Sequence, residues 1–226
     1  MIIPARFNGP PGSGNGGYTA GLVAARLARA AGAGAVEVTL RRPPPLDTPL
    51  TVTTAETGDA VQVHDGEALV ASARVDTGDR PEAVPGVSFA AAVEASAKYP
   101  GFTAHPFPTC YVCGPERTDG LALFPGPLPD GRTATPWRVP QEVSPVLLWA
   151  ALDCPGGWSV LTEGRPYVLG RITTHVDAVP EPGTECVITG RHVASQGRKA
   201  TVLSTLHGPG GDVLAVAAAT WIAVDR

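Results

Sequence analysis

The strongest constraint on the fold of this 226-residue chain is an order of elements that occurs twice. In each cycle a short apolar helix is predicted before several long segments in which apolar and polar residues alternate, as they do in half-buried β-strands. LDTPLTVT (46–53) aligns with PGTECVIT (182–189), and HDGEALVA (64–71) aligns with HGPGGDVLAV (207–216) with a longer turn. The same kinds of element in the same order indicate an internal duplication.

The first cycle begins with a helix predicted from Tyr18 to about Ala31, in which Leu22, Val23 and Leu27 form the apolar face. Gly32 and Gly34 are expected to end this helix, because glycine readily adopts the conformation that terminates one. Strands are predicted over 35–42, 51–64 and 67–75, with a tight Asp65-Gly66 turn before the last.

The second cycle contains a predicted strand over 120–126 and a predicted helix over Ser144–Cys154. Pro145 is tolerated in the first turn of that helix, and Pro155-Gly156-Gly157 is expected to end it. Further strands are predicted over 167–176, over 185–193 with a continuation at 199–207, and over 212–224. These elements predict an α+β fold with a first unit over 1–77, a linker over 78–109 and a second unit over 110–226.

Composition limits the function classes that need to be considered. The chain is 43% hydrophobic and 17% charged, which is typical of a globular protein with a substantial core. Its formal net charge of −4 gives no basic field for nucleic acid or an anionic membrane surface. The longest apolar run, Val213–Ala219, is too short to span a bilayer, and Pro4 interrupts any signal-like start. Four cysteines without an export signal favour a cytosolic location, and the Ala, Gly, Pro and Arg bias suggests a bacterial source.

A glycine-rich segment precedes the first helix. Gly12, Gly14 and Gly17 form G-x-G-x-x-G with Glu37 downstream, the pattern of a dinucleotide site. No parallel strand-helix alternation surrounds it, so we reject that interpretation. The amides of Gly16 and Gly17 at a helix N-terminus remain candidate donors that could polarise a carbonyl group. The alternative is an ordinary flexible start of a helix.

Asp153 ends the otherwise apolar second helix, beside Leu152 and Cys154. The helix dipole disfavours an acid at this end, so its presence needs a reason. A partly buried carboxylate with a raised pKa could act as general base or nucleophile. The alternative is a surface carboxylate.

The two helix starts resemble those of hot-dog thioesterases, where His-Gly-Gly supplies an amide donor and an acid follows nine positions after the histidine. Asn15-Gly16-Gly17 is similar to that start, but Ala24 stands nine positions on. Ser144-Pro145-Val146 is followed nine positions on by Asp153, although Pro145 has no N–H to donate. The resemblance therefore implies one composite site, in which Gly16, with Gly17, polarises a thioester carbonyl and Asp153 activates water.

A second resemblance covers Cys110–Leu123, CYVCGPERTDGLAL. It is similar to the Cys-x-x-Cys-Gly-Pro stretch that opens many hot-dog domains of the phenylacetate-type thioesterase group. Together the resemblances imply a double hot-dog protein, with two tandem units that each wrap a long antiparallel sheet around a helix. They imply hydrolysis of an acyl thioester, expected to be acyl-CoA, with coenzyme A as part of the substrate and no separate cofactor.

Other residues are weaker candidates for a role. Thr174, with Thr173, could hydrogen-bond the attacking water. Cys110 and Cys113 could form half of a zinc site with His105 or a redox pair, but packing is the favoured interpretation and no metal is predicted. Coenzyme A phosphates could be bound by basic residues of the second unit: Arg165, Arg171, Arg191, Arg198 and Lys199.

Neither helix start carries the histidine of the family pattern, which leaves a second function open. A non-catalytic hot-dog module that binds an acyl or aromatic ligand would not need it. A hydratase is a weaker third option, because no histidine follows Asp153 closely. Exposed edge strands could also support self-association into a homo-oligomer.

Overall fold

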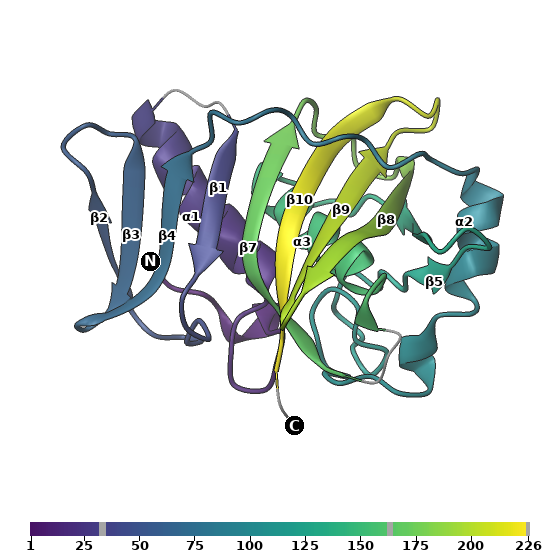
Figure 1. The fold of residues 1–226 in the computed structure, drawn as a ribbon, viewed down its shortest axis with the longest axis horizontal. Helices are drawn as coiled ribbons and strands as arrows, with labels where there is room; N and C mark the ends of the chain where they lie inside the picture. The colour runs from purple at the N-terminus through teal and green to yellow at the C-terminus, as the bar shows by residue number, and fades with distance from the viewer. Residues whose placement is uncertain (32–34, 162–164, 225–226) are drawn as a thin grey trace.

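The computed structural model describes residues 1–31, 35–161 and 165–224. Within these residues ten strands form one sheet in which every neighbouring pair is antiparallel, in the order β2-β3-β4-β1-β7-β10-β9-β8-β6-β5. Figure 1 shows the broad sheet in front, with the two long helices behind it. None of the described helices is both long and apolar enough to span a membrane.

The elements follow one another along the chain in two groups. The helices are η1 (Ala5–Phe7), α1 (Gly16–Ala31), α2 (Phe89–Ser96), η2 (Pro100–Phe102) and α3 (Pro145–Gly157). The strands are β1 (Val36–Leu40), β2 (Thr51–Thr54), β3 (Ala60–Asp65), β4 (Ala68–Val75), β5 (Gly126–Pro127), β6 (Thr133–Arg138), β7 (Tyr167–Val176), β8 (Glu185–Gln196), β9 (Lys199–His207) and β10 (Val213–Ala223).

The order of the central strands is the same when read outward from the middle of the sheet. On one side lie β1, β4, β3 and β2, and on the other lie β7, β10, β9 and β8. The halves meet where β1 pairs with β7, with Val36 opposite Thr174 and Val38 opposite Ile172. Each half thus has four equivalent strands and one long helix, as the duplicated sequence pattern predicts.

Helices α1 and α3 pack against each other as well as against the sheet. A Cβ atom on Gly17 would lie 2.5 Å from the Trp149 carbonyl oxygen, and one on Gly21 would lie 2.8 Å from the Val146 carbonyl oxygen. Glycine at these two positions, one helical turn apart, lets the helix backbones approach closely. Side chains from both helices and both halves of the sheet form one continuous core.

Four differences between the expected and the observed elements need explanation. The single strand predicted over 51–64 is two strands, β2 and β3, which pair with each other because Gly58, at φ 75°, lets the chain reverse between them. Helix α3 does not end before Pro155 but continues to Gly157, because its last turn fits under β9 and β10: a Cβ on Gly156 would meet Ser204 Oγ at 2.6 Å, and one on Gly157 would meet the Trp221 ring at 2.3 Å. The segment 120–126 forms no long strand, since Leu121 and Leu123 donate their amides to carbonyls of the cysteine-containing loop instead. Strand β6 was not predicted, because Pro136 interrupts its pattern.

Helix α1 ends at Ala31 in the structure, and the predicted helix-ending glycines Gly32 and Gly34 lie outside the described residues.

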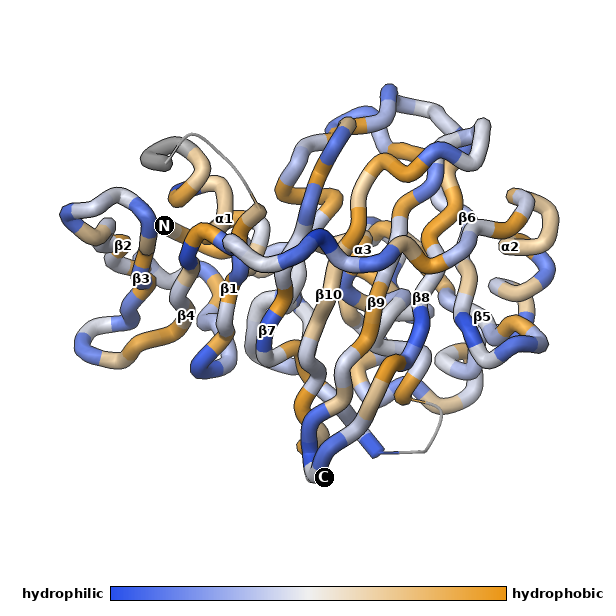
Figure 2. Tube along the Cα trace, turned by 45° about the horizontal axis from the view of Figure 1, so that its top comes forward, coloured by the Kyte–Doolittle hydropathy of each residue, from blue (hydrophilic) through white to orange (hydrophobic). Residues whose placement is uncertain are grey.

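The segment between β4 and α2 crosses the face of the sheet opposite to the helices, in front of β10 and β9 (Figure 2). Thr205 Oγ1 accepts a 2.8 Å hydrogen bond from the Val84 amide, and Arg80 forms an ion pair with Asp177. This segment belongs to the predicted linker, which also contains α2 and η2. The unit boundaries at 77/78 and 109/110 stay predictions.

Candidate functional site

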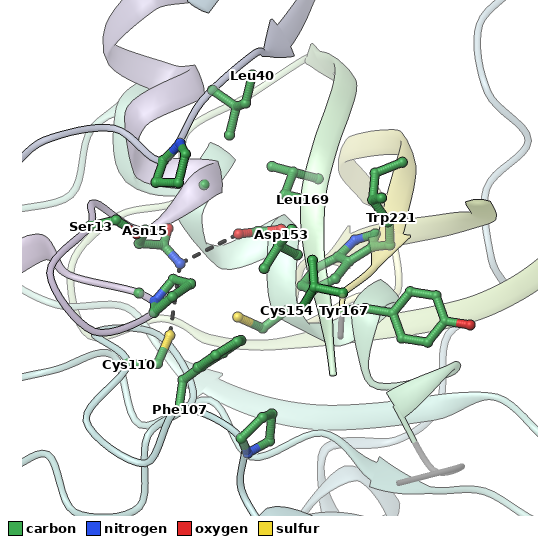
Figure 3. Close-up of a pocket in the computed structure, with 18 of the residues that line it drawn as sticks. Ser13, Asn15, Leu40, Phe107, Cys110, Asp153, Cys154, Tyr167, Leu169 and Trp221 are labelled. Carbon is green, nitrogen blue, oxygen red and sulfur yellow. Dashed lines mark hydrogen bonds between the residues drawn. The ribbon is translucent and has the colours of Figure 1, made fainter. Parts of the chain in front are cut away.

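A cavity of about 400 Å³ lies where the start of α1 meets the later turns of α3. Its walls include Phe107, Trp158, Leu169 and Trp221, so most of its lining is apolar. Asp153 lies in the same wall, among the side chains labelled in Figure 3. The arrangement places one carboxylate in a largely apolar chamber, which is the usual form of a small-molecule site.

Asp153 is held from the opposite half of the molecule. Its side chain is 2% exposed, and its Oδ2 atom accepts a 2.8 Å hydrogen bond from the Gly17 amide. The Asn15 side-chain amide donates to the same oxygen at 3.4 Å (Figure 3). The positive end of the α1 dipole therefore compensates the carboxylate, and this explains why an acid is tolerated in the later part of α3.

The other carboxylate oxygen, Oδ1, is not used by either of these hydrogen bonds. Among the described residues, Oδ1 of Asp153 has no hydrogen-bond partner although it is buried. Burial raises the pKa of Asp153 from 3.8 to about 7, against the opposing effect of the Gly17 amide; nearby Cys110 raises it further, and Asn15 lowers it. A carboxyl group with this pKa can accept or release a proton near neutral pH.

Asn15 combines two tasks through the two ends of its amide group. Its Oδ1 accepts a 2.8 Å hydrogen bond from the Tyr18 amide, which caps the first turn of α1. Its Nδ2 donates to Asp153 and, at 3.8 Å, to the sulfur of Cys110. A side chain with both an acceptor and donors can cap the helix and orient the acid at once.

The two glycines of the predicted site have different positions. The Gly17 amide donates to Asp153, so it is not open to a substrate carbonyl, and the expected donor role of Gly17 needs correction. Gly16 lines the cavity, and no hydrogen bond among the described residues uses its amide. A Cβ on Gly16 would lie 2.8 Å from Leu169 Cβ, so only glycine fits against β7 here.

Thr174 does not join this group. It lies on β7 five residues beyond Leu169, which is about 16 Å along an extended strand. Its side chain lines a second cavity of about 540 Å³, formed by the start of α3 and the middle of α1. A water held by Asp153 is out of its reach, so the expected role of Thr174 is not supported; its neighbour Thr173 projects to the other face of the sheet.

The second cavity is the counterpart of the first under the approximate symmetry of the two halves. Pro145 and Val146 stand at its helix start, and Ala24 stands in its wall where Asp153 stands in the first cavity. Pro145 offers no amide and Ala24 offers no carboxylate. The acid and the free amide of the sequence pattern therefore meet in the first cavity and not in the second.

The basic residues suggested for phosphate binding lie elsewhere. Arg171 contacts Glu37, Arg191 pairs with Glu82, and none of the five suggested residues is among the described residues lining the first cavity. Arg41 and Arg42 do line it, and both are exposed. The Arg-Arg pair directly before Pro43-Pro44 at the end of β1 was the signal that could have identified them.

Three cysteines meet beside Asp153. The sulfur atoms of Cys110, Cys113 and Cys154 all lie within 4.8 Å of one another, and all three residues are buried. Cys154, which lies far from the other two in the sequence, joins them because the later part of α3 lies against the loop 106–116. The thiols of Cys113 and Cys154 hold the pKa of Cys110 well below its usual range, an effect to which backbone amides of Cys113 and Val112 add.

Comparison with known proteins gives results only at the level of structure. No protein-family model matches the chain, and no curated protein matches its sequence. A hot-dog protein of unknown function from Alicyclobacillus acidocaldarius is similar with a TM-score of 0.63, at 15% identity, over 99% of this chain and 92% of that chain.

Two further solved structures are similar along nearly the whole chain. A candidate thioesterase from Novosphingobium aromaticivorans has a TM-score of 0.66 at 18% identity, over 99% of this chain and 94% of that one. An acyl-CoA thioesterase II from Mycobacterium marinum has a TM-score of 0.56 at 13% identity, over 93% and 90%. With the repeated helix-and-sheet unit described above, these similarities show that the chain has the double hot-dog fold.

Proposed function

We propose that this protein hydrolyses an acyl thioester, with acyl-CoA as the substrate class, at the cavity between α1 and α3. One observation carries the proposal: the buried Oδ1 atom of Asp153 has no partner among the described residues, and Asp153 lines the same cavity as Gly16. A base and an oxyanion donor in one apolar chamber are the two groups that acyl transfer to water requires.

In this mechanism the thioester carbonyl oxygen accepts a hydrogen bond from the Gly16 amide. Asp153 Oδ1 takes a proton from a water molecule as the water oxygen bonds to the carbonyl carbon. The carbon–sulfur bond then breaks, and the proton passes to the departing thiolate, so that the products are a carboxylic acid and a thiol. The amide would stabilise the transition state by about 3 kcal/mol, and the base would add about 10²–10⁴-fold in rate.

The walls and mouth of the cavity support this class of substrate. Phe107, Leu169 and Trp221 offer an apolar surface to an acyl or aryl group. Arg41 and Arg42 at the mouth carry charges of the sign that the phosphates of coenzyme A need. The Mycobacterium marinum protein with the same fold is named an acyl-CoA thioesterase, which is consistent with this assignment.

A second candidate function follows from the other oxygen of the carboxylate. Asp153 Oδ2 accepts the Gly17 amide and the Asn15 side chain, and a purely structural acid would do the same. In that case the cavity would bind an acyl or aromatic ligand without turning it over.

Hydrolysis of an acyl-CoA panel from acetyl to palmitoyl, with phenylacetyl-CoA included, separates the two functions. We expect turnover by the wild type and by Asp130→Asn, a matched change at an exposed surface acid, and a loss of about 10²–10⁴-fold in kcat for Asp153→Asn. Absence of turnover together with ligand-induced thermal stabilisation would replace hydrolysis by the binding function. Equal turnover by Asp153→Asn would remove Asp153 from the mechanism.

A cytosolic location and self-association through exposed edge strands are also proposals. Strand β2 forms one edge of the sheet, and three of its four residues are exposed. An exposed edge can pair with a second copy of the chain. Sedimentation across a concentration series tests this, and a constant monomeric mass would rule it out.

A further inference from the structure

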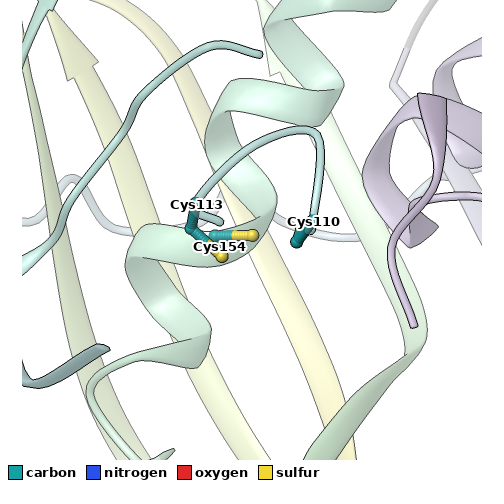
Figure 4. A group of neighbouring side chains, drawn as sticks. All are labelled: Cys110, Cys113 and Cys154. Carbon is teal, nitrogen blue, oxygen red and sulfur yellow. The ribbon is translucent and has the colours of Figure 1, made fainter. Parts of the chain in front are cut away.

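Cys110, Cys113 and Cys154 form a group that the hydrolytic mechanism does not use. Two of them come from the loop before β5, and the third is the residue after Asp153 on α3 (Figure 4). Their sulfur atoms all lie within 4.8 Å of one another. We refer to these three residues as the thiol cluster.

The spacing of the thiol cluster is close to that of a zinc–thiolate site. A zinc–sulfur bond of about 2.3 Å in a tetrahedron separates two sulfur ligands by about 3.8 Å. The observed limit of 4.8 Å exceeds this by an amount that small side-chain rotations remove. Cys-x-x-Cys with a third cysteine from a distant helix is a common arrangement of ligands for such an ion.

The loop that carries two of the cysteines is fixed by its own hydrogen bonds. The Cys110 amide donates to Phe107 O at 2.9 Å, and the Gly114 amide donates to Cys110 O at 2.9 Å. Tyr99 Oη donates to Cys113 O at 3.0 Å. A Cβ on Gly114 would lie 2.5 Å from the Cys110 nitrogen, so the turn needs glycine directly after the second cysteine. The ligand positions are therefore set before any ion binds.

Two side chains are placed to donate hydrogen bonds to the sulfurs. His105 Nδ1 accepts from the Phe107 amide at 2.8 Å, so the ring proton belongs on Nε2, which lies 3.4 Å from the Cys113 sulfur. Asn15 Nδ2 donates to the Cys110 sulfur at 3.8 Å. Donors of this kind support thiolate ligands from outside the coordination sphere. His105 is thus a partner of the ligands rather than a ligand.

Simple packing does not account for the convergence of the sulfurs. A buried free cysteine often acts as a small apolar residue, as Cys186 does on β8, where it is fully buried and opposite Trp137. No group of potential metal ligands found among the described residues includes Cys186. The chain therefore contains both kinds of cysteine, and only the other three are gathered at one point.

We propose that the thiol cluster binds one zinc ion through three thiolates. Thiolate ligands favour zinc and other thiophilic ions over magnesium or calcium. All three cysteines also line the cavity, so the fourth position of the ion faces the cavity and takes a water molecule or a ligand bound there. The bound ion ties the loop 106–116 to α3 next to Asp153.

Metal binding is tested on the full chain, first freed of metal by a chelator under reducing conditions. Titration with Co²⁺ is expected to produce a thiolate-to-cobalt charge-transfer band that saturates at one ion per chain, and Zn²⁺ is expected to abolish that band. Elemental analysis after exposure to Zn²⁺ and gel filtration gives the stoichiometry independently of any activity.

Serine variants identify the ligands. Cys110→Ser, Cys113→Ser and Cys154→Ser should each lose the charge-transfer band, while the matched Cys186→Ser should retain it. Removing the outer donor with His105→Ala should weaken zinc binding by about 10–100-fold without changing the stoichiometry. Circular dichroism with chelator present checks that each variant folds as the metal-free wild type does.

Two results would overturn the proposal. One is a folded wild type that shows no cobalt band and whose thiols all react with a thiol reagent in the presence of Zn²⁺. The other is a disulfide between two cluster cysteines in protein isolated without reductant, combined with no metal uptake after reduction. The second result would make the cluster a redox pair.

Discussion

The Gly17 amide donates a 2.8 Å hydrogen bond to Oδ2 of Asp153, although 136 positions separate the two residues in the chain. This bond joins the start of α1 in the first half to the later part of α3 in the second. Among the described residues the other oxygen, Oδ1, has no partner, and Asp153 lines the cavity, so the contact both stabilises the buried charge and orients it.

The pH dependence of stability should reveal the buried carboxyl group in the metal-free protein. Burial raises the pKa of Asp153 from 3.8 to about 7, so the unfolded chain releases this proton near pH 4 while the folded chain keeps it. Between these values the folded state binds more protons, and the wild type loses stability as the pH rises. The difference between the two pKa values corresponds to about 4 kcal/mol.

Asp153→Asn carries no such proton. The free energy of unfolding of the variant minus that of the wild type should therefore increase by about 4 kcal/mol from about pH 4 to about pH 8. Urea unfolding of both proteins with chelator and reductant present measures this. A constant difference across the pH range would mean that the pKa of Asp153 is not raised.

Gly17→Ala should destabilise the protein by about 1–3 kcal/mol, because the new Cβ would lie 2.5 Å from both Asp153 Cβ and the Trp149 carbonyl oxygen. The helices must separate to admit it. Gly78→Ala is the matched control, since its nearest neighbouring atom is an ordinary 3.5 Å away, and its effect should stay within about 0.5 kcal/mol. Equal denaturation midpoints for the two variants would contradict the close approach of α1 and α3.

Substitution of Asn15 should separate its two tasks. Asn15→Ser keeps an oxygen for the Tyr18 amide but is too short to reach Asp153, so stability should change by only a few tenths of a kcal/mol while hydrolysis falls on the order of tenfold. Asn15→Ala should lose about 1 kcal/mol of stability in addition. Thermal unfolding and acyl-CoA hydrolysis of the two variants measure both effects. If serine retains full activity, the amide contact to Asp153 has no part in catalysis.

Arg41→Ala and Arg42→Ala should each raise KM for acyl-CoA by about two- to fivefold, with less effect in high salt, because exposed charge pairs are weak and screened. The same acyl group on pantetheine, which lacks the nucleotide phosphates, should show no change. Arg138→Ala removes an exposed arginine paired with Glu185 away from the cavity and serves as the control. A KM shift shared by both substrates would instead indicate an altered cavity.

Local patterns predicted most strands of the fold but not the ends of every element. Alternation predicts β7 in two stretches. Tyr167 and Leu169 face the core, Arg171 is exposed, and the buried positions resume one residue later at Ile172 and Thr174, where the pairing with β10 shifts register. The end of α3 was not predictable in this way, since the helix continues through Pro155 to Gly156 and Gly157, which pack closely against Ser204 of β9 and Trp221 of β10. Packing between distant elements decided that boundary.

In the candidate site too, local spacing predicted single residues but not the contacts between distant elements. The nine-residue spacing led to Asp153, and the glycines at the start of α1 led to Gly16. The occupied amide of Gly17 and the approach of Cys154 to Cys110 depend on how α1, α3 and a loop meet, and no local spacing encodes that meeting. The expected role of Thr174 fails for a related reason. Thr174 does lie on the strand after α3, but it is five residues along β7 from Leu169, which lines the first cavity.

The equivalent strand order in the two halves has a consequence for how substitutions can alter the two cavities of this protein. In a homodimer of single units every substitution appears in both cavities, and a loss in one is a loss in both. Here each half has its own codons, so Ala24 and Asp153 occupy equivalent places without constraining each other. A single chain also cannot dissociate on dilution. One cavity can therefore be redesigned for a new ligand while the other remains as it is.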